Sequence, residues 1–360
     1  MWMAILAGLL AAIVVIVLFM RRGEGDKATA TGTNRRPAAN TSAPSADSDA
    51  LPYDTEETQN VAVEGLKIAF GVARTDYNIM GEHAQVLASV AESLEESVHQ
   101  REYFPRRPMQ LPKLLQAIND SESTRAELVR LILEDPTLAG TVLQRANSAF
   151  YRVSPAPVEN LDRAVFLLGT DGLRGLMAAA ILQPVFRVPR GYFEAFADST
   201  WEQAERISNA AETCARQLRN ADPFVTQLLS MLTMLANIVV FRLTMDKYRD
   251  HPNVLPRAEV FIAAIQAHRA RMASLIASTW QLSDPSMVAL QEREQRVSPA
   301  QMSPVGRCIY YGELCGALAL LESRKVHSRD GAFAILKQQG LSEADVLTLW
   351  QAATAFERQH

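Results

Sequence analysis

Apolar residues recur at helical spacing along most of this 360-residue chain, and this pattern limits the possible fold more than any other feature. Between residues 111 and 143 the spacing places the apolar side chains on one face of each successive helix. These residues are Leu114, Leu115, Ile118, Leu128, Leu131, Ile132, Leu138, Val142 and Leu143. Asp135-Pro136 predicts a helix start, with Asp as the N-cap residue and Pro at the first helical position, where its missing N–H costs nothing.

The remainder of the chain also shows helical spacing, with almost no strand signal. Val86, Val90, Leu94 and Val98 recur every four residues, which predicts an amphipathic helix over 81–100. Further helices are expected over 200–218, 224–244, 259–280, 285–294, 303–322 and from 342 onward. Residues 61–80 fit either a strand or a short helix. The predicted fold class is therefore all-α.

The helix expected over 224–244 is apolar nearly all round and carries no charge before Arg242. Two interpretations fit this composition: a second membrane span, or the central buried helix of a helical domain. Ser230, Thr233 and Asn237, together with the helices on either side, favour the buried helix. In the helix over 303–322, two glycines at 312 and 316 permit close approach of another helix.

Residues 2–20 form an uncharged apolar run, and Arg21-Arg22 follow it directly. At about 1.5 Å per residue, a helix of this length approaches the ~30 Å hydrocarbon core of a bilayer. A cleaved secretory signal is the alternative, but its positive charge would precede the apolar run. The positive-inside tendency predicts a single-pass anchor over residues 1–22 in a bacterial inner membrane, with the N-terminus outside and the rest of the chain in the cytoplasm.

Residues 23–60 are rich in small and polar residues and contain few large apolar groups. Such a segment cannot bury enough apolar surface to order itself, so we expect a disordered linker between the anchor and the helical domain. The basic pairs Arg21-Arg22 and Arg35-Arg36 permit contact with anionic lipid, although a solvated linker is the simpler interpretation.

Charge and cysteine content exclude some classes of protein. The formal net charge is −4, so the chain lacks the basic character of nucleic-acid-binding proteins, and no nucleic-acid partner is expected. The three cysteines, Cys214, Cys308 and Cys315, are too few and too scattered for a disulfide framework and fit a reducing compartment. We expect them to be buried thiols in apolar surroundings.

Four short motifs between residues 111 and 169 carry a family resemblance. They read Leu-Pro-Lys-Leu-Leu at 111–115, Leu-Glu-Asp-Pro-Thr-Leu-Ala at 133–139, Arg-Ala-Asn-Ser-Ala-Phe-Tyr at 145–151 and Ala-Val-Phe-Leu-Leu-Gly at 164–169. Together these motifs resemble the HDOD family, the HD-related output domain of bacterial signalling proteins. The resemblance is strong over 111–182 and weaker up to about residue 295. It implies a two-part helical bundle related to metal-dependent phosphohydrolases.

The resemblance also implies how the chain is organised. A helical extension would occupy 61–107, the HDOD-like domain 108–295, and helices that pack on this domain 296–360. The residues that match structural positions of the family motifs are Asn147, Ser148, Tyr151, Gly169 and Trp280. For Asn147-Ser148, a polar helix end that bonds to backbone groups competes with a ligand site.

An HD-type phosphohydrolase needs histidines and an adjacent His-Asp pair to hold its metal ions. This chain contains no His-Asp dipeptide. The resemblance places Gln203 where the family often has His, Thr233 and Met234 at the His-Asp pair, and Arg269 near a further frequent His. Hydroxyl and thioether groups are poor ligands for Mg²⁺ or Mn²⁺. These four residues are expected to line a vestigial pocket, without catalytic residues, metal or cofactor.

Two main classes of function remain, and a third is weaker. We expect a non-catalytic regulatory scaffold that binds another signalling protein at the membrane and contacts the bilayer through residues 2–20. The alternatives are a metal-dependent HD-type phosphohydrolase, and a receptor for a small nucleotide messenger in the vestigial pocket. Missing metal ligands separate the first two classes, and thermal stabilisation by a ligand would reveal the third. The sequence does not identify the protein partner.

Overall fold

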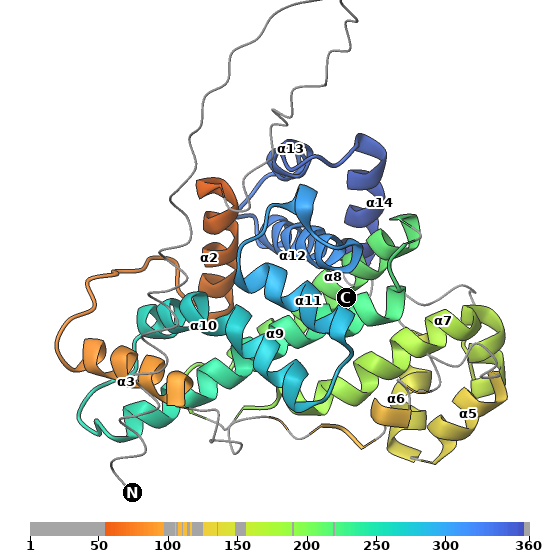
Figure 1. Ribbon diagram of the computed structural model, residues 1–360, viewed down its shortest axis with the longest axis horizontal. Coiled ribbons are helices and arrows are strands. Elements are labelled where there is room, and N and C mark those ends of the chain that lie inside the picture. The colour runs from red at the N-terminus through yellow and green to blue at the C-terminus, as the bar shows by residue number, and fades with distance from the viewer. Residues whose placement is uncertain are drawn as a thin grey trace, which may run out of the picture. The chain divides into compact units, whose positions relative to one another are not determined.

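Helices make up the secondary structure of the residues that the structure describes (Figure 1). The computed structural model describes residues 55–355 with gaps at 97–104, 106, 110, 114–115, 117–124, 135, 148–155, 189–190 and 219. No strand occurs among these residues, so the predicted all-α fold class is confirmed. The predicted membrane anchor and most of the predicted linker lie outside the described residues.

The elements follow one another along the chain as a series of α-helices with two short 3-10 helices. The α-helices are α2 (Glu56–Phe70), α3 (Glu82–Glu96), α5 (Arg125–Leu133), α6 (Pro136–Ala146), α7 (Leu161–Leu182), α8 (Phe196–Leu218), α9 (Pro223–Arg249), α10 (Ala258–Thr279), α11 (Asp284–Glu294), α12 (Pro304–Ser323), α13 (Arg329–Gln338) and α14 (Glu343–Thr354). The 3-10 helices are η1 (Gln183–Phe186) after α7 and η2 (Pro299–Gln301) after α11.

Helix α9 is surrounded by other helices and packs against α3, α7, α8, α10 and α12. It begins at Pro223, and the Asp222 carboxylate before it accepts a hydrogen bond from the Val225 N–H at 2.8 Å, which satisfies a helix-end donor. Among the described helices, α9 is long and apolar enough to cross a membrane, yet 94% of its apolar window is buried inside the protein. The burial fits the predicted core helix and not a second membrane span.

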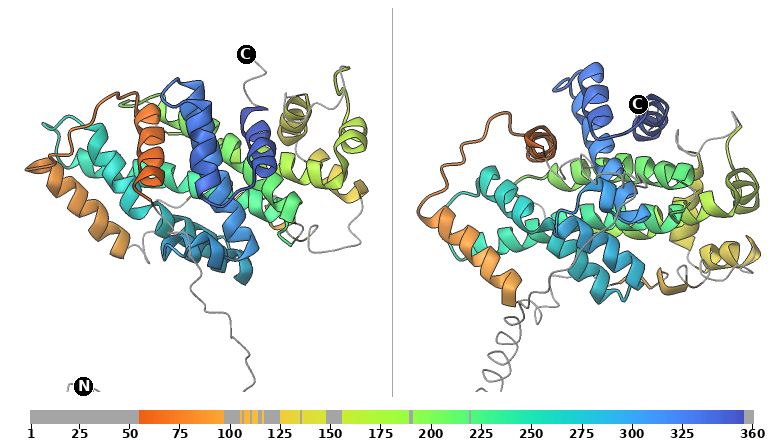
Figure 2. Two further views of the ribbon diagram at one scale, coloured as in Figure 1. Left: turned by 90° about the horizontal axis from the view of Figure 1, so that it is seen from above. Right: turned by 45° about the horizontal axis from the view of Figure 1, so that its top comes forward.

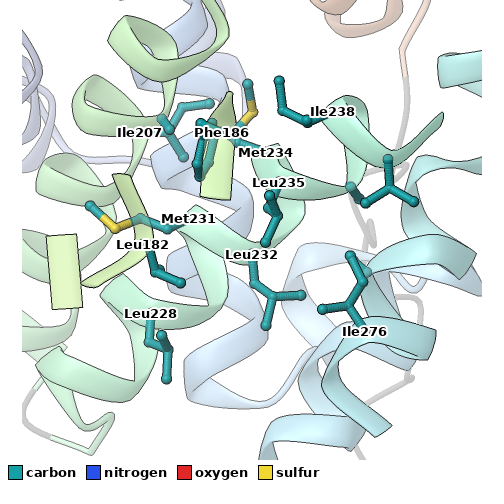
Figure 3. Packing of buried hydrophobic residues seen from close by; sticks show 14 of the residues in the cluster. Leu182, Phe186, Ile207, Leu228, Met231, Leu232, Met234, Leu235, Ile238 and Ile276 are labelled. Carbon is teal, nitrogen blue, oxygen red and sulfur yellow. The ribbon is translucent and has the colours of Figure 1, made fainter. Parts of the chain in front are cut away.

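The core around α9 is shown in Figure 3. Its labelled side chains are Leu182 and Phe186 at the end of α7 and in η1, Ile207 of α8, Ile276 of α10, and Leu228, Met231, Leu232, Met234, Leu235 and Ile238 of α9. None of these side chains is more than 3% exposed. Burying one such side chain stabilises the fold by about 1.5–3 kcal/mol, so the apolar composition of α9 is what holds the helices around it.

Helices α8 and α12 approach each other closely through two glycines. A Cβ added to Gly312 would lie 2.5 Å from the Ala211 Cβ, and one added to Gly316 would lie 2.7 Å from the Ile207 Cα. Only glycine leaves room for backbones this close, so the predicted close approach at these two positions is confirmed. Helix α12 begins at Pro304, and the Ser303 hydroxyl caps it by accepting a hydrogen bond from the Gly306 N–H at 3.1 Å.

Helix α2 resolves the ambiguous segment 61–80. Residues up to Phe70 are helical and the following residues are not, so the strand interpretation is wrong. The helix begins at Glu56, inside the segment predicted as linker, because the Thr55 hydroxyl caps it by accepting from the Thr58 N–H at 3.2 Å. It ends at Gly71, whose φ of 68° is favourable for glycine.

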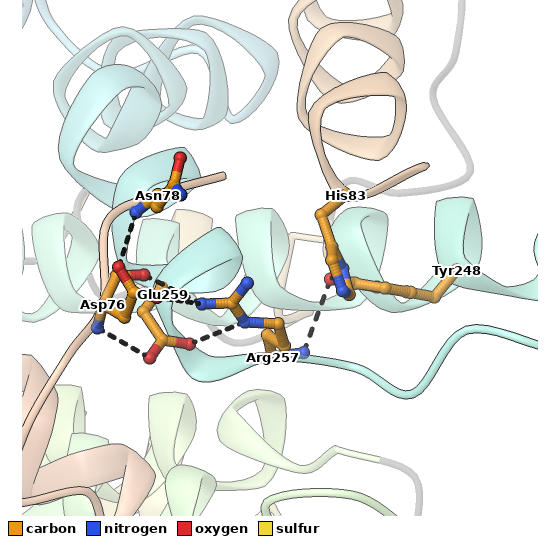
Figure 4. A network of polar contacts seen from close by, with 6 residues as sticks. All are labelled: Asp76, Asn78, His83, Tyr248, Arg257 and Glu259. Atoms are coloured by element: carbon orange, nitrogen blue, oxygen red, sulfur yellow. Dashed lines mark hydrogen bonds and ion pairs between the residues drawn. The ribbon is translucent and has the colours of Figure 1, made fainter. Parts of the chain in front are cut away.

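Polar contacts attach the segment after α2, and the start of α3, to the central helices (Figure 4). The Asp76 N–H donates to Glu259 at 3.1 Å, and Arg257 donates to the Asp76 carbonyl at 2.9 Å. The His83 ring nitrogen Nδ1 lies 2.9 Å from the Tyr248 hydroxyl. The predicted N-terminal extension is therefore docked on the α9–α10 pair.

The residues predicted from family motifs have structural roles where they are described. Asn147 bridges the end of α6 to the chain before α7, because its side-chain amide donates to the Val158 carbonyl (2.9 Å) and accepts from the Val158 N–H (2.7 Å). Gly169 has a φ of 67° and interrupts α7, as expected for a turn between helices. The buried Trp280 donates from its indole nitrogen to the Pro105 carbonyl at 2.9 Å. Ser148 and Tyr151 lie outside the described residues.

Candidate functional site

A cavity of about 160 Å³ lies where α2 and α12 meet the central helices. Helices α8, α9 and α10 and the end of α11 supply the rest of its wall. Helices α2 and α12 pack side by side, although more than two hundred residues separate them in the sequence (Figure 2). The cavity therefore exists only when the helices on both sides of the predicted HDOD-like domain are docked.

The four residues predicted to form the vestigial pocket come together here. Gln203 of α8, Met234 of α9 and Arg269 of α10 line the cavity. Thr233 lines an adjoining cavity of about 30 Å³, whose wall also includes Arg269. The family-motif residues Asn147, Gly169 and Trp280 line neither cavity. The sequence thus identified a set of neighbours that are up to 66 residues apart along the chain.

A largely buried carboxylate at this site, whose side chain is 14% exposed, was not identified from the sequence. Glu313 of α12 forms an ion pair with Arg293, and the Arg269 guanidinium lies 4.0 Å from the same carboxylate oxygen. The Thr233 hydroxyl is placed to donate either to the Ser230 carbonyl, at 2.8 Å, or to Glu313. Glu313 of α12 is thus surrounded by groups from three other helices, α9, α10 and α11, and we call Glu313, Arg269, Arg293 and Thr233 the charge cluster.

Burial by itself would raise the pKa of Glu313, but its neighbours outweigh this effect. The charges of Arg293 and Arg269, together with the Thr233 hydroxyl, lower the pKa below its ordinary value of 4.5. Glu313 is therefore ionised at neutral pH. A sequence signal for it did exist: it is the one charged residue between positions 308 and 321 of an otherwise apolar helix, and buried charges need partners.

The side chains at the site do not fit a divalent cation. Thr233 offers a hydroxyl, Met234 a thioether and Gln203 an amide, while the carboxylate of the wall is engaged by two guanidinium groups. Mg²⁺ and Mn²⁺ prefer carboxylate and water oxygens, and the arginines would repel them. In the part of the chain that the structure describes, no group of three His, Cys, Asp or Glu side chains could hold a metal ion.

The fold and the site define an all-helical module with a central apolar helix and a partly buried arginine–carboxylate cluster. These features define a structural class and not a reaction. The chain belongs to the HDOD domain family, which matches residues 104–296, more than half of its length. The match begins next to Pro105, whose carbonyl accepts the Trp280 hydrogen bond. The helices α2 and α12 that complete the cavity lie outside this match. Among curated proteins, no sequence relative matches the chain.

Solved structures of bacterial proteins share this fold. A protein of Shewanella amazonensis SB2B named as a metal-dependent phosphohydrolase is 14% identical, with a TM-score of 0.55 over 77% of this chain and 99% of that chain. An HDOD domain protein of Geobacter sulfurreducens is 14% identical, with a TM-score of 0.52 over 76% and 96%. A protein of Marinobacter aquaeolei VT8 named as a signal transduction protein is 17% identical, with a TM-score of 0.52 over 79% and 66%. At such identities the similarity shows the fold alone.

Proposed function

We propose that this HDOD protein is a non-catalytic regulatory module that acts by binding another protein. The charge cluster carries the proposal, because Arg293 and Arg269 engage the carboxylate at the place where a hydrolase would need ligands for metal ions. Phosphoryl hydrolysis depends on metal ions that activate water and neutralise phosphate charge. The side chains of Thr233 and Met234 supply neither function.

A metal-dependent phosphohydrolase is the alternative, and the name of the Shewanella amazonensis neighbour favours it. The full chain, incubated with Mn²⁺, Mg²⁺ or Fe²⁺, is offered p-nitrophenyl phosphate and cyclic dinucleotides. We expect no stoichiometric metal and no hydrolysis above that of the Thr233→Val variant, which lacks the hydroxyl at the site. One metal ion per chain, together with turnover that Thr233→Val abolishes, would overturn the non-catalytic proposal.

Exposed apolar side chains on α5 and α7 support binding of another protein. Leu133 is 61% exposed and Phe166 is 73% exposed, and the two helices that carry them pack together. A contiguous exposed patch of large apolar side chains is typical of an interaction surface, whereas single exposed apolar residues are common. We propose that this surface of α5 and α7 contacts the partner protein.

Glutamate substitutions on α5 and α7, compared with one elsewhere on the surface, distinguish loss of this binding surface from a general effect of added charge. After crosslinking in cells, the full chain is purified with its bound proteins, and the same is done for Phe166→Glu and Leu133→Glu. A matched control is Leu255→Glu, because Leu255 is 71% exposed but lies between α9 and α10. We expect a discrete partner that is lost with the first two variants and kept with the control. If the same partner is recovered in equal amounts with the full chain and with all three variants, the surface of α5 and α7 does not bind it.

We further propose that residues 2–20 anchor the protein in a bacterial inner membrane, with the helical domain in the cytoplasm. Anchoring raises the effective concentration of the module for partners at the same surface. A reporter that functions only in the cytoplasm, fused after His360, should be active. Activity of a periplasm-dependent reporter at the same position, or a mature N-terminus beyond residue 20, would contradict the topology.

A further inference from the structure

We propose that the 160 Å³ cavity binds a small phosphate monoester. Its wall contains three arginines, Arg269, Arg293 and Arg296, and one carboxylate, Glu313, so these side chains sum to two positive charges. A phosphate monoester carries about −1.5 to −2 charges at neutral pH, which matches this sum. Guanidinium groups also suit phosphate oxygens geometrically, because their N–H donors form a planar fork.

Arg269 is the arginine best placed to hold the phosphate group. Its guanidinium approaches Glu313 only to 4.0 Å, beyond the roughly 2.7–2.9 Å of a charge-assisted hydrogen bond, and the described residues offer it no closer polar partner. Arg293, in contrast, donates to Glu313 and lies over the Tyr310 ring, 5.2 Å from its centroid. The Arg269 side chain is 32% exposed, so a ligand that enters the cavity can reach it.

Asn237 supplies the second, independent observation. It lines the cavity and is only 2% exposed, yet its side-chain oxygen Oδ1 has no hydrogen-bond partner among the described residues. Its amide nitrogen lies 3.9 Å from the Met234 sulfur, which is a weak acceptor. A buried acceptor without a donor costs about 1–3 kcal/mol. The oxygen itself is shielded from solvent, so a ligand hydroxyl reaches it only when the Asn237 amide turns toward the cavity. A donor placed there would remove this cost, and the proposed ligand therefore carries a hydroxyl group in its organic part.

The volume of the cavity limits the size of the ligand. A cavity of about 150 Å³ in another protein encloses one benzene molecule, while sites for drug-sized ligands measure about 300–1,000 Å³. The cavity here, at about 160 Å³, has room for a phosphate group with a few carbon atoms. A cyclic dinucleotide is too large to be enclosed, so the ligand differs from the nucleotide messenger considered from the sequence.

The source of the phosphate monoester is either a soluble metabolite or a lipid headgroup, and two titrations distinguish them. In the first, the full chain in detergent micelles is titrated calorimetrically with glycerol 3-phosphate, at constant ionic strength with chloride as the competing anion. In the second, the micelles contain phosphatidic acid, and phosphatidylcholine, which lacks a monoester phosphate, is the control. Saturable binding in either titration supports the proposal. Its absence in both overturns it.

Variants test whether the binding occurs in this cavity. Loss of a charge-assisted hydrogen bond should weaken binding by about 10- to 100-fold in Arg269→Gln, with partial recovery in Arg269→Lys. The matched control is Arg249→Gln, because Arg249 is 72% exposed at the end of α9, away from the cavity wall. If Arg249→Gln weakens binding as much as Arg269→Gln, the binding is nonspecific and the proposal fails.

The Asn237→Leu variant separates a ligand contact from a structural role. Replacing an unsatisfied buried amide with an apolar group of similar size should leave the thermal midpoint unchanged or raise it. The affinity for glycerol 3-phosphate should fall several-fold, while the affinity for inorganic phosphate, which lacks the organic hydroxyl groups, should stay the same. Equal loss for both ligands would overturn the assignment of Asn237. These outcomes are independent of the protein-binding proposal, whose test uses α5 and α7.

Discussion

Removing the buried charge of Glu313 is the perturbation that most directly tests the physical account of the site. Glu313 is 14% exposed and Arg293 is 8% exposed, so Glu313→Gln leaves a buried guanidinium without its carboxylate. Breaking a buried ion pair in this way costs about 3–5 kcal/mol. Arg269 adds less to this cost, because it lies 4.0 Å away and is 32% exposed. We expect the free energy of unfolding of Glu313→Gln to fall by about 3–5 kcal/mol at neutral pH.

The pH dependence of this difference has a definite sign. The pKa of Glu313 is lower in the folded protein than its ordinary value of 4.5. A carboxylate with a lowered pKa stabilises the fold at pH values above its unfolded pKa, and the stabilisation is lost as the pH falls through the folded pKa. The stability difference between the parent protein and Glu313→Gln should therefore be constant near neutral pH and should narrow as the pH falls below 4.5.

Urea unfolding of the full chain, followed by tryptophan fluorescence, measures these differences. The matched control is Glu343→Gln, because Glu343 is 76% exposed and pairs with Lys337 at the protein surface. Such a surface pair contributes at most about 1 kcal/mol. The double variant Arg293→Met with Glu313→Leu replaces the pair by apolar groups and should recover most of the lost stability. If Glu313→Gln costs no more than Glu343→Gln, the charge cluster is not a buried ion pair and the account of the site is wrong.

Three further predictions test the packing of the fold. Gly316→Ala should lower the free energy of unfolding by about 2 kcal/mol, because overpacking against the Ile207 backbone costs about 3 kcal/mol and the better helix propensity of Ala returns only roughly 1 kcal/mol. The matched control is Gly140→Ala, where the added Cβ has no atom within 4 Å. In the same unfolding assay this control should raise the free energy of unfolding by about 0.5–1 kcal/mol. Trp280→Phe removes the donor to a backbone carbonyl in a buried contact and should cost at least about 1–3 kcal/mol by thermal unfolding. None of the three buried cysteines should react with a thiol reagent at pH 8 until urea is added; rapid labelling of the folded protein would contradict their burial.

The cysteine prediction has a physical cause in the contact between α8 and α12. Hydrogen bonding with Cys214, together with burial, raises the pKa of Cys308. Burial also raises the pKa of Cys315. The thiolate is the reactive form, so a raised pKa and the absence of solvent both slow the reaction.

Helical periodicity was sufficient to predict most elements of the fold. The central helix was predicted over 224–244 and extends over Pro223–Arg249. It could be predicted because a helix that is apolar on every side must be buried on every side. The start of α2 was missed by several residues. The composition of the first turn, with Glu56, Glu57 and Gln59, resembles that of a linker. Only the N-cap position of Thr55 and the burial of Thr58 and Val61 distinguish this helix from a linker.

The candidate site was predictable in part. Gln203, Thr233, Met234 and Arg269 were grouped through the motifs of a family, and the structure brings them to two adjoining cavities. Glu313 was not grouped with them, because its place at the site depends on α12 packing against α8. No local pattern within α12 specifies which helix it will meet. Tertiary contacts between segments far apart in sequence are therefore what the sequence leaves undetermined.

The cavity lies where an N-terminal helix, α2, and a C-terminal helix, α12, meet the central helices. Helix α2 comes directly after the segment predicted to reach the membrane, and α12 begins the C-terminal helices; both form its wall together with α8, α9 and α10. Any ligand that binds this wall stabilises the docked arrangement of α2 and α12 by its binding free energy. By the same linkage, a partner protein that favours a different placement of α2 or α12 lowers the affinity for the ligand, and the ligand lowers the affinity for that partner equally. This coupling is sufficient for regulation, because the only requirement is that ligand and partner differ in their preference for the docked helices.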